Sequence, residues 1–360
     1  MDNKGVEIVP ERILIIKLSA LGDVVQALPV LSALKDTWHS CQIDWITGEV
    51  GAGLLHGHPL IRRLIVYQRN RLGRLAANPV KWPLLAQELY GLRHYLREGR
   101  YDMALDLQGL FKSGLITWLS GARQRVGYAG GREASSLFLN RKLPKYDPDR
   151  HAVLRYLDVA RYLGAEVDKI RFPLGLSAQD MEQAKSFIHQ MGLEPNEFII
   201  IVPGTIWPTK HWTIEGFSRV ADLIFQRTGL KSLIAGSGAD TPLASQIEAG
   251  SHGGAIDITG KTSLKLFAAL SSLATAGITT DTGPMHLAAA AGLRVVALFG
   301  PTAPWRTGPF GRGHIVLRKG LECSPCFKRQ CTKVDCMKAI SPQEVVESVE
   351  RLLASRQSHN

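Results

Sequence analysis

Residues 279–300 read TTDTGPMHLAAAAGLRVVALFG, and this stretch decides the fold class of the chain. Thr282 can cap a helix that has Pro284 at its first position and an alanine-rich run behind it. Gly292 ends that helix, and the apolar run after it predicts a strand. The first turn of a helix leaves N–H groups unpaired at the positive end of its dipole, and Gly283 lets an anion approach them. The stretch therefore predicts a phosphate site at a helix start, although any capped helix shares part of this pattern.

The same alternation of strand and helix signals continues on both sides of this stretch. We expect strands at 12–18, 42–47, 64–67, 101–107, 198–202, 231–235, 256–258, 276–280 and 294–299. We expect helices at 24–37, 84–98, 112–119, 151–163, 178–191, 213–228, 240–249, 263–274, 284–291 and 342–356, the first of them broken at Pro29. Residues 123–150 predict an irregular, basic segment. The order predicts an α/β protein with two parallel, doubly wound, Rossmann-like sheets and ligands at the carboxyl ends of the strands.

The length of the chain predicts more than one domain. A chain of 360 residues is too long for one typical core, so we expect two α/β domains, residues 1–174 and 175–340. Residues 341–360 predict a C-terminal helix that packs back toward the first domain. The sequence has neither a secretory signal at its start nor an apolar run near the ~20 residues of a membrane span, so we expect a cytoplasmic protein with reduced thiols.

The net charge of +11 is unevenly distributed. Residues 1–175 carry 25 lysines and arginines against 17 acidic residues, whereas the remaining residues carry 18 against 15. Nine basic residues and only two acidic ones lie between Arg62 and Arg100. This excess predicts an anionic partner such as a nucleic acid, an acidic membrane surface or a phosphorylated substrate, unless it only solubilises the surface. The position of Trp82 among polar residues fits a membrane-skimming surface at least as well as base stacking.

Five short segments occur in a fixed order along the chain. They are KLSALGD at 17–23 with Leu28-Pro29 after it, DLQGLFKS at 106–113, KHW at 210–212, DTGPMHL at 281–287 and FGPT at 299–302. Together they resemble the bacterial ADP-heptose:lipopolysaccharide heptosyltransferases of glycosyltransferase family 9, over residues 12 to 353. The first two segments are more similar to the enzymes that add the first heptose.

The resemblance implies a fold and a function. The implied fold is GT-B, in which two Rossmann-like domains face each other across a cleft, the first holding the acceptor and the second the nucleotide sugar. The implied reaction is inverting transfer of heptose from ADP-heptose to the Kdo–lipid A inner core. Such an enzyme would be cytoplasmic and peripherally associated with the inner leaflet of the cytoplasmic membrane.

Two residues are the candidates for catalysis. The resemblance assigns the general base to Asp23, although the spacing Asp23-Val24-Val25-Gln26 also fits a capping box, and a cap would stabilise the carboxylate and weaken it as a base. The departing diphosphate needs positive charge, which the N–H groups around Thr282-Gly283 can supply together with Lys210. An ordinary surface lysine is the alternative for Lys210.

Four further residues are candidates for donor binding. The resemblance implies that Asp281 binds sugar hydroxyls and that Asp240 binds the ribose, although Asp240 fits a helix N-cap equally well. His286 would orient the phosphates or the sugar, or would be a buried histidine bonded to a neighbouring loop. Family members carry two threonines before the lysine; here Thr205 remains a phosphate ligand, while Ile206 replaces the second.

The acceptor candidates belong to the first domain. They are Arg62, Arg63, Asp106, Gln108, Lys112 and Arg141. The resemblance places Asp106 and Gln108 at acceptor recognition, and the basic side chains could meet lipid phosphates or the carboxylates of an inner-core sugar. An internal ion pair of Asp106 with Lys112 or Arg141 is the alternative.

Neither a catalytic metal nor a cofactor is expected. The clear Asp-x-Asp motif, Asp147-Pro148-Asp149, follows no strand and fits a solvated turn. Cys323, Cys326, Cys331 and Cys336 stand within 14 residues and could hold a tetrahedral zinc ion or an iron–sulfur cluster, or remain as free or paired thiols. The spacing lacks a second Cys-x2-Cys pair, which favours the thiols.

Alternatives within and outside the family stay open at this stage. Another family 9 transferase would add a second heptose or a different sugar. A nicotinamide-dependent oxidoreductase would need a Gly-x-Gly-x-x-Gly motif after the first strand, and residues 19–23 lack those glycines. A nucleic-acid-binding protein would explain the positive charge but not the five segments, so we expect no nucleic-acid partner.

Overall fold

The computed structural model describes residues 9–357, so residues 1–8 and 358–360 of the expected domains lie outside the described part. The chain divides into two compact units. The first unit ends at Gly175 and the second begins at Leu176. The boundary expected from the sequence lies one residue earlier.

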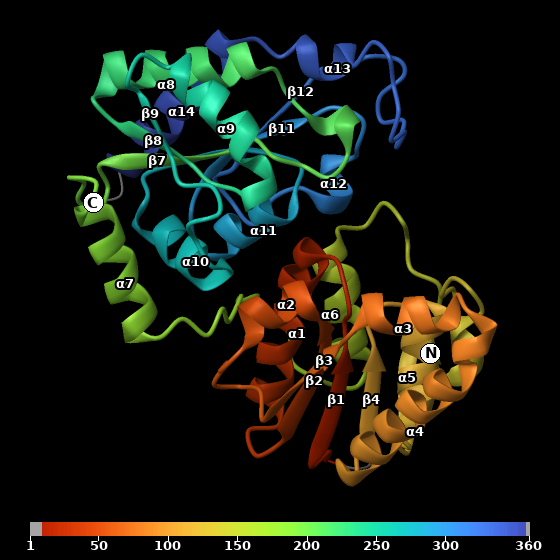
Figure 1. The fold of residues 1–360 in the computed structure, drawn as a ribbon. Helices are drawn as coiled ribbons and strands as arrows, with labels where there is room; N and C mark the ends of the chain where they lie inside the picture. Colours follow the sequence, from red (N-terminus) through yellow and green to blue (C-terminus); the bar gives the residue numbers. More distant parts are fainter. Residues whose placement is uncertain (1–8, 358–360) are drawn as a thin grey trace. The chain divides into compact units, whose positions relative to one another are not determined.

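The first unit contains a parallel sheet of six strands in the order β3-β2-β1-β4-β5-β6 (Figure 1). The strands are β1 (Arg12–Ile16), β2 (Gln42–Gly48), β3 (Arg63–Tyr67), β4 (Met103–Asp106), β5 (Gln124–Tyr128) and β6 (Arg141–Leu143). The helices are α1 (Leu21–Thr37), α2 (Glu49–Leu55), α3 (Arg69–Ala76), α4 (Trp82–Glu98), α5 (Phe111–Leu119) and α6 (Ala152–Tyr162), with short 3-10 turns η1 (Pro79–Lys81) and η2 (Ser135–Phe138). The chain runs outward from β1 to β3 and then returns to place β4 beside β1.

The second unit repeats this topology in the order β12-β11-β10-β7-β8-β9. Its strands are β7 (Phe198–Val202), β8 (Lys231–Ile234), β9 (Ala255–Asp257), β10 (Gly277–Thr280), β11 (Val295–Phe299) and β12 (Ile315–Arg318). Its helices are α7 (Ala178–His189), α8 (Ile214–Thr228), α9 (Thr241–Ala249), α10 (Leu264–Leu273), α11 (Gly283–Ala290), α12 (Pro304–Thr307), α13 (Asp335–Lys338) and α14 (Pro342–Gln357), with 3-10 turns η3 (Pro208–Lys210) and η4 (Gly238–Asp240). Both sheets are parallel and doubly wound, which confirms the predicted α/β class.

Helices cover both faces of the first sheet, which is why its central strands β1 and β4 are buried and mostly apolar. On one face, Leu14 and Ile16 of β1 pack against Leu96 of α4 and Ile116 of α5. Strand residues alternate between faces, so Ile15 belongs to the opposite side. On this face α1 and α6 pack against each other.

The last helix completes the core of the second unit. Val345 and Val349 of α14 are fully buried in a cluster with Ile201 of β7 and with Phe217 and Val220 of α8. The sequence suggested that residues 341–360 pack toward the first domain, whereas the structure packs α14 against α8 and β11 of its own unit. On the other face of this sheet, α10 packs against α7 and α11.

Three parts of the first half differ from expectation. Helix α1 continues through Pro29 without the expected break, because buried residues on both sides of the proline hold it against α6. Residues 123–150 are not irregular throughout, since β5 and β6 extend the sheet. Both strands are short and begin with polar residues, so sheet pairing rather than local pattern forms them. Helices α2 and α3 were also not expected.

Candidate active site

Each sheet reverses its winding between two central strands, and parallel α/β sheets bind ligands at the carboxyl ends of such strands. We call the carboxyl ends of β1 and β4, with the loops that follow them, the first crossover. The carboxyl ends of β7 and β10, with their following loops, form the second crossover. The first crossover lies within the first unit, and the second crossover lies within the second unit.

Asp23 lies at the first crossover, in the first turn of α1. It is the third residue of the helix and not its N-cap, which is Ala20. Its Oδ2 accepts a hydrogen bond from the Ala20 N–H at 3.1 Å. The capping alternative is therefore realised in part, but with Asp23 inside the helix. The side chain remains 40% exposed, which leaves the carboxylate open to a ligand.

A buried lysine and a tyrosine hold the other oxygen of Asp23. Lys17 Nζ donates to the Tyr156 hydroxyl at 2.8 Å, and that hydroxyl donates to Asp23 Oδ1 at 2.9 Å. Lys17 Nζ also donates to the Leu107 carbonyl and lies 3.8 Å from Asp23 Oδ1. Burial lowers the pKa of Lys17, while burial and the Asp23 charge raise the pKa of Tyr156. The tyrosine therefore stays protonated and donates to the carboxylate.

Gln108 joins the two loops of the first crossover. Its Oε1 accepts hydrogen bonds from the N–H groups of Leu18 and Ser19, each at 3.1 Å. These two residues begin the loop that leads into Asp23. The amide of Gln108 is thus engaged in positioning this loop, a role that the sequence did not predict.

Asp106 is buried at the end of β4. Its Oδ1 accepts hydrogen bonds from the N–H groups of Gln108 and Gly109, both at 2.9 Å, while its buried Oδ2 has no hydrogen-bond partner. Burial raises the pKa of Asp106 against the effect of these donors and of Lys17. Among the described residues, Asp106 forms no ion pair with Lys112 or Arg141. Asp106 therefore shapes the turn that carries Gln108.

Several cations surround the first crossover. Arg132 and Arg155 both act on Lys17 and lower its pKa. Lys112, in the first turn of α5, is half-buried, and its pKa is lowered by burial and by Arg69 of α3. The edge around Asp23 is therefore positively charged, although Arg69, Arg132 and Arg155 were not among the predicted residues.

Arg62 and Arg63 are not at this edge, and their placement corrects the expectation. They stand at the start of β3, whose first residue pairs with Asp44 near the start of β2. Both guanidinium groups donate to the buried carboxylate of Asp44, at distances between 2.7 and 2.9 Å. A residue that precedes a parallel strand lies at its amino end, opposite the site. Both guanidinium groups therefore serve the fold, by binding the buried carboxylate of Asp44.

Arg141 is likewise engaged within its own part of the sheet. It is the first residue of β6, donates to Gln124 Oε1 at 2.8 Å and lies over the ring of Tyr162. These contacts hold its guanidinium beside β5 and α6.

The second crossover holds a buried ion pair. Lys210 Nζ lies 2.7 Å from Asp281 Oδ2, and the Thr302 hydroxyl donates to the same oxygen at 2.6 Å. Lys210 is only 14% exposed and its ammonium lies over the Trp207 ring, so it is not an ordinary surface lysine. Both partners of the pair follow the carboxyl ends of central strands, which confirms the predicted edge for them.

Helix α11 begins beside this ion pair. Thr282 occupies the N-cap position in extended conformation, but its side chain accepts no capping hydrogen bond. Gly283 is the first helical residue, so Pro284 stands second rather than first. Because proline has no N–H, Gly283 and Met285 supply the free amides of the first turn. His286 is buried within the same turn, at 8% exposure.

Asp240 lies close to the second crossover and is already partly satisfied. Its Oδ2 accepts hydrogen bonds from the Ser237 N–H at 2.8 Å and from the Ser237 hydroxyl at 2.7 Å. A side chain at Gly204 would place its Cβ 2.3 Å from Asp240 Oδ1, so the carboxylate packs directly on the loop after β7. Asp240 occupies the N-cap position of α9 but makes no side-chain capping bond there; its bonds to Ser237 close the 3-10 turn η4 instead. Thr205, the next residue of that loop, is half-buried.

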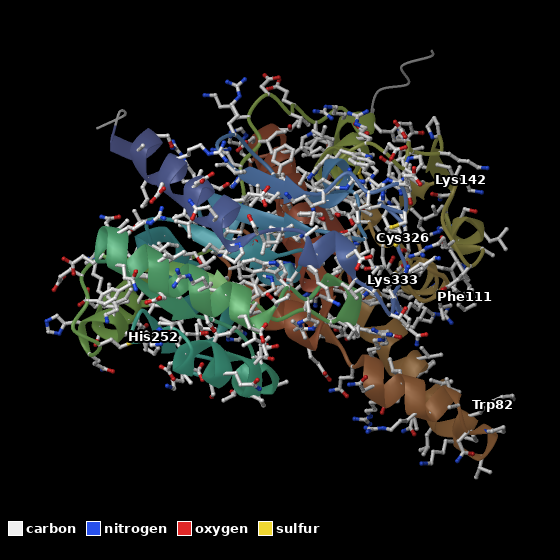
Figure 2. The ribbon with its side chains drawn as sticks, turned by 90° about the horizontal axis from the view of Figure 1, so that it is seen from above. Trp82, Phe111, Lys142, His252, Cys326 and Lys333 are labelled. Atoms are coloured by element: carbon white, nitrogen blue, oxygen red, sulfur yellow. The ribbon has the colours of Figure 1, made fainter. Side chains whose placement is uncertain are left out.

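The four clustered cysteines are free thiols that line one small cavity of about 100 Å³, together with Thr209 and Pro301. Figure 2 labels Cys326 and Lys333, two of its lining residues. Burial and the neighbouring thiols raise the pKa of Cys336, while the Val334 and Lys333 N–H groups lower that of Cys331. Between residues 9 and 357, no three His, Cys, Asp or Glu side chains are placed to hold a metal ion.

Sequence reasoning missed partners that are distant along the chain. Lys17 had a usable signal, because a lysine directly after a buried apolar strand marks a strand end. Tyr156 lies on α6, 133 residues from Asp23, and nothing in its local sequence indicates the contact. Thr302 belongs to a quoted segment, yet its bond to Asp281 depends on the pairing of β10 with β11.

Comparisons with known proteins identify the family of the chain. The sequence model of glycosyltransferase family 9 (heptosyltransferase) matches residues 89–336. Lipopolysaccharide heptosyltransferase 1 of Pseudomonas aeruginosa is 29% identical over 95% of this chain and 98% of its own length. The lipopolysaccharide core heptosyltransferase OpsX of Haemophilus influenzae is 28% identical, over 84% and 82%.

Solved structures of related chains share the whole fold. The family 9 glycosyl transferase of Veillonella parvula has a TM-score of 0.80 at 25% identity, over 96% of this chain and 97% of its own. The E. coli heptosyltransferase WaaC with ADP has a TM-score of 0.76 at 24% identity, over 95% and 99%. These likenesses confirm the GT-B fold expected from the sequence.

Proposed function

The chain belongs to glycosyltransferase family 9, and we propose that it transfers heptose from ADP-heptose to the Kdo–lipid A inner core of lipopolysaccharide with inversion. The observation that carries the proposal is the contrast between two equivalent positions of a repeated fold. The first crossover offers a half-exposed carboxylate, and the second offers an amine beside a helix start. A base and a leaving-group site are the two functions that inverting transfer needs.

In the proposed reaction, Asp23 takes the proton of the acceptor hydroxyl. The hydroxyl oxygen then bonds to the anomeric carbon of the heptose on the face opposite the diphosphate, and the bond from that carbon to ADP breaks. Tyr156 and Ala20 donate to the two oxygens of Asp23 and fix the carboxylate in one orientation. Its exposed part can still accept the proton, so the hydrogen bonds orient the base without covering it.

ADP leaves with the electrons of the broken bond, so negative charge develops on its diphosphate. The Gly283 and Met285 amides at the start of α11 and the ammonium of Lys210 can stabilise that charge. Lys210 is paired with Asp281 before the donor binds, and the diphosphate would compete for this ammonium. Asp281 would then retain Thr302 and become an acceptor for sugar hydroxyls.

Other residues would complete both subsites. Thr205 and His286 are the proposed further contacts to the phosphates or sugar, and Asp240 the proposed contact to the ribose. For the acceptor, Lys112 and Gln108 lie at the correct edge, with Arg69, Arg132 and Arg155 as added candidates. We propose that the enzyme works at the inner leaflet of the cytoplasmic membrane, where such an acceptor would be located.

The base is tested by Asp23→Asn, which keeps the side-chain shape and an oxygen for the Ala20 N–H. We expect kcat to fall about 10²- to 10⁴-fold, because the amide cannot take a proton. Asp168→Asn, at an exposed carboxylate of the first unit that belongs to neither crossover, is the matched control. Near-normal turnover of Asp23→Asn would remove this residue from the reaction.

The donor is tested by thermal shift with ADP, UDP, GDP and CMP at equal concentration. We expect ADP to stabilise the chain most, in wild type and in Asp23→Asn alike, because Asp23 does not belong to the nucleotide subsite. A preference for UDP or GDP would assign another sugar donor. Transfer to a once-heptosylated acceptor but not to Kdo–lipid A would instead assign addition of the second heptose.

A further inference from the structure

We propose that the α3–α4 tip, defined as residues 69–84, docks on the surface of a bilayer that contains anionic lipids. The inference deepens the proposed function, because it names the surface through which an enzyme with a lipid acceptor would reach that lipid. It depends on contacts and exposures that none of the catalytic residues share.

The tip carries large apolar side chains that are exposed to solvent. Val80 is 86% exposed, Trp82 57% and Leu84 53%. Neither α3 nor η1 buries any residue. Figure 2 shows Trp82 near the far end of this helical hairpin, where it points away from the rest of the first unit. Exposed apolar residues grouped at one end of an element mark an interaction surface rather than scattered surface positions.

Helices α3 and α4 form a hairpin whose base packs on the core of the first unit. The tip is therefore held in a fixed position. Leu89 and Leu92 of α4 pack on the core of the first unit, and Leu96 is fully buried there. An ion pair between Arg71 and Glu88 joins α3 to α4. The exposed tip is therefore an ordered part of the first unit.

The apolar side chains of the tip favour a lipid partner over a nucleic acid. The Trp82 indole N–H already donates to the Ala76 carbonyl at 3.2 Å, so the ring can enter an apolar layer without leaving a donor unpaired. Val80 and Leu84 flank it with aliphatic groups, which suit acyl chains but offer no stacking face to a base.

The charge of the tip specifies an anionic surface. The tip contains four basic residues and no acidic one, namely Arg69, Arg71, Arg74 and Lys81. Arg71 is paired with Glu88 of α4, so three of the four positive charges are not offset by that pair. Basic side chains beside exposed apolar ones are typical of segments that lie on anionic membranes. A second copy of the same tip would meet it with like charge, which disfavours self-association through this surface.

The location connects the tip to the first crossover. Helix α3 follows the carboxyl end of β3, and Arg69 at its start acts on the pKa of Lys112 in α5. The basic side of the tip therefore continues into the positively charged edge around Asp23. A lipid headgroup held by the tip would be located at the edge where the acceptor hydroxyl is needed.

The test is co-sedimentation of the full chain with vesicles of equimolar phosphatidylcholine and phosphatidylglycerol, against vesicles of phosphatidylcholine alone. We expect binding to the anionic vesicles only, weakened by salt. The double variant Val80→Ser/Trp82→Ala should reduce the partition coefficient about tenfold, and Arg74→Glu/Lys81→Glu at least as much. Trp118→Ala on α5 removes a similarly exposed tryptophan and should change nothing.

Two results would overturn the proposal. One is equal binding of wild type and Val80→Ser/Trp82→Ala, and the other is wild-type binding to single-stranded RNA in preference to the vesicles. Transfer to a deacylated, water-soluble acceptor separates this inference from the proposed function. The tip variants should keep that activity, whereas its absence in wild type would contradict the reaction and leave the vesicle result standing.

Discussion

The two crossovers have the same topology but treat their carboxylates in opposite ways. Asp23 at the first is 40% exposed and accepts hydrogen bonds from the neutral Tyr156 and Ala20 groups, while the Lys17 ammonium lies 3.8 Å from its Oδ1. Asp281 at the second is 8% exposed and in direct contact with Lys210 and Thr302. An open carboxylate suits proton transfer, whereas a neutralised one lets a diphosphate bind nearby without repulsion. A repeated fold thus acquires two chemical roles through its loops.

Removing the Lys210 ammonium should impair the function of the second crossover and leave the first crossover intact. We expect Lys210→Met to lower kcat about 10²- to 10³-fold, because the leaving diphosphate loses the Lys210 charge and Asp281 loses its ion pair beside it. ADP affinity should also fall. Lys185→Met, at an exposed position on α7, is the control for loss of a lysine. Unchanged kcat with weaker ADP binding would assign Lys210 to binding only.

A milder change tests the first crossover. We expect Tyr156→Phe to lower kcat about tenfold, since it removes one donor that orients Asp23 but keeps the ring over which Lys17 lies. The acid limb of the kcat/KM profile against pH should move to higher pH, because the carboxylate loses a stabilising hydrogen bond. A loss of stability without any movement of this limb would show a purely structural role.

A titrating group at the start of α14, which belongs to neither crossover, should affect stability and not turnover. Glu344, at the start of α14, is bonded by Lys319 and Ser341, and these bonds lower its pKa to about 2. A carboxylate with a depressed pKa stabilises the fold above its unfolded pKa, and this contribution is lost as pH falls from about 4.5 toward 2. We expect Glu344→Gln to cost about 1 kcal/mol at pH 6, after allowance for solvent screening of this partly exposed group, and nothing near pH 2. Denaturant unfolding at several pH values measures the difference, and a constant cost across this range would contradict it.

Metal removal should have the smallest effect. Dialysis against EDTA is expected to leave kcat unchanged, because the proposed positive charge comes from an amine and backbone amides. Metal analysis of the same sample would settle whether the cysteine cavity of the second unit holds an ion. A chelator-dependent loss of kcat, restored by a divalent cation, would contradict the proposed leaving-group site.

The sequence was sufficient for the fold class and for residues at the carboxyl ends of central strands or in the segments that follow them. Asp23, Asp106, Lys210 and Asp281 all lie where the strand pattern placed them, because the carboxyl ends of parallel strands share one edge. Arg62 and Arg63 stand instead at the amino end of β3, and this distinction was readable from the sequence.

What the sequence did not disclose depends on contacts between distant segments. The bond of Tyr156 to Asp23 requires α6 to pack on α1, and the strands β5 and β6 require β4 as a template. Neither partner has a local pattern that indicates the other. Such contacts follow from the assembled fold, in which burial and pairing override local propensity.

The bond between Gln108 and the loop after β1 restricts how this protein can be recombined with its relatives. One amide oxygen, some ninety positions downstream, sets the course of the backbone that leads to Asp23. A chimera joined anywhere between residues 23 and 108 would combine the Asp23 segment of one parent with the Gln108 of another. Exchanges that keep both segments from the same parent should preserve turnover, so the first unit is best swapped whole.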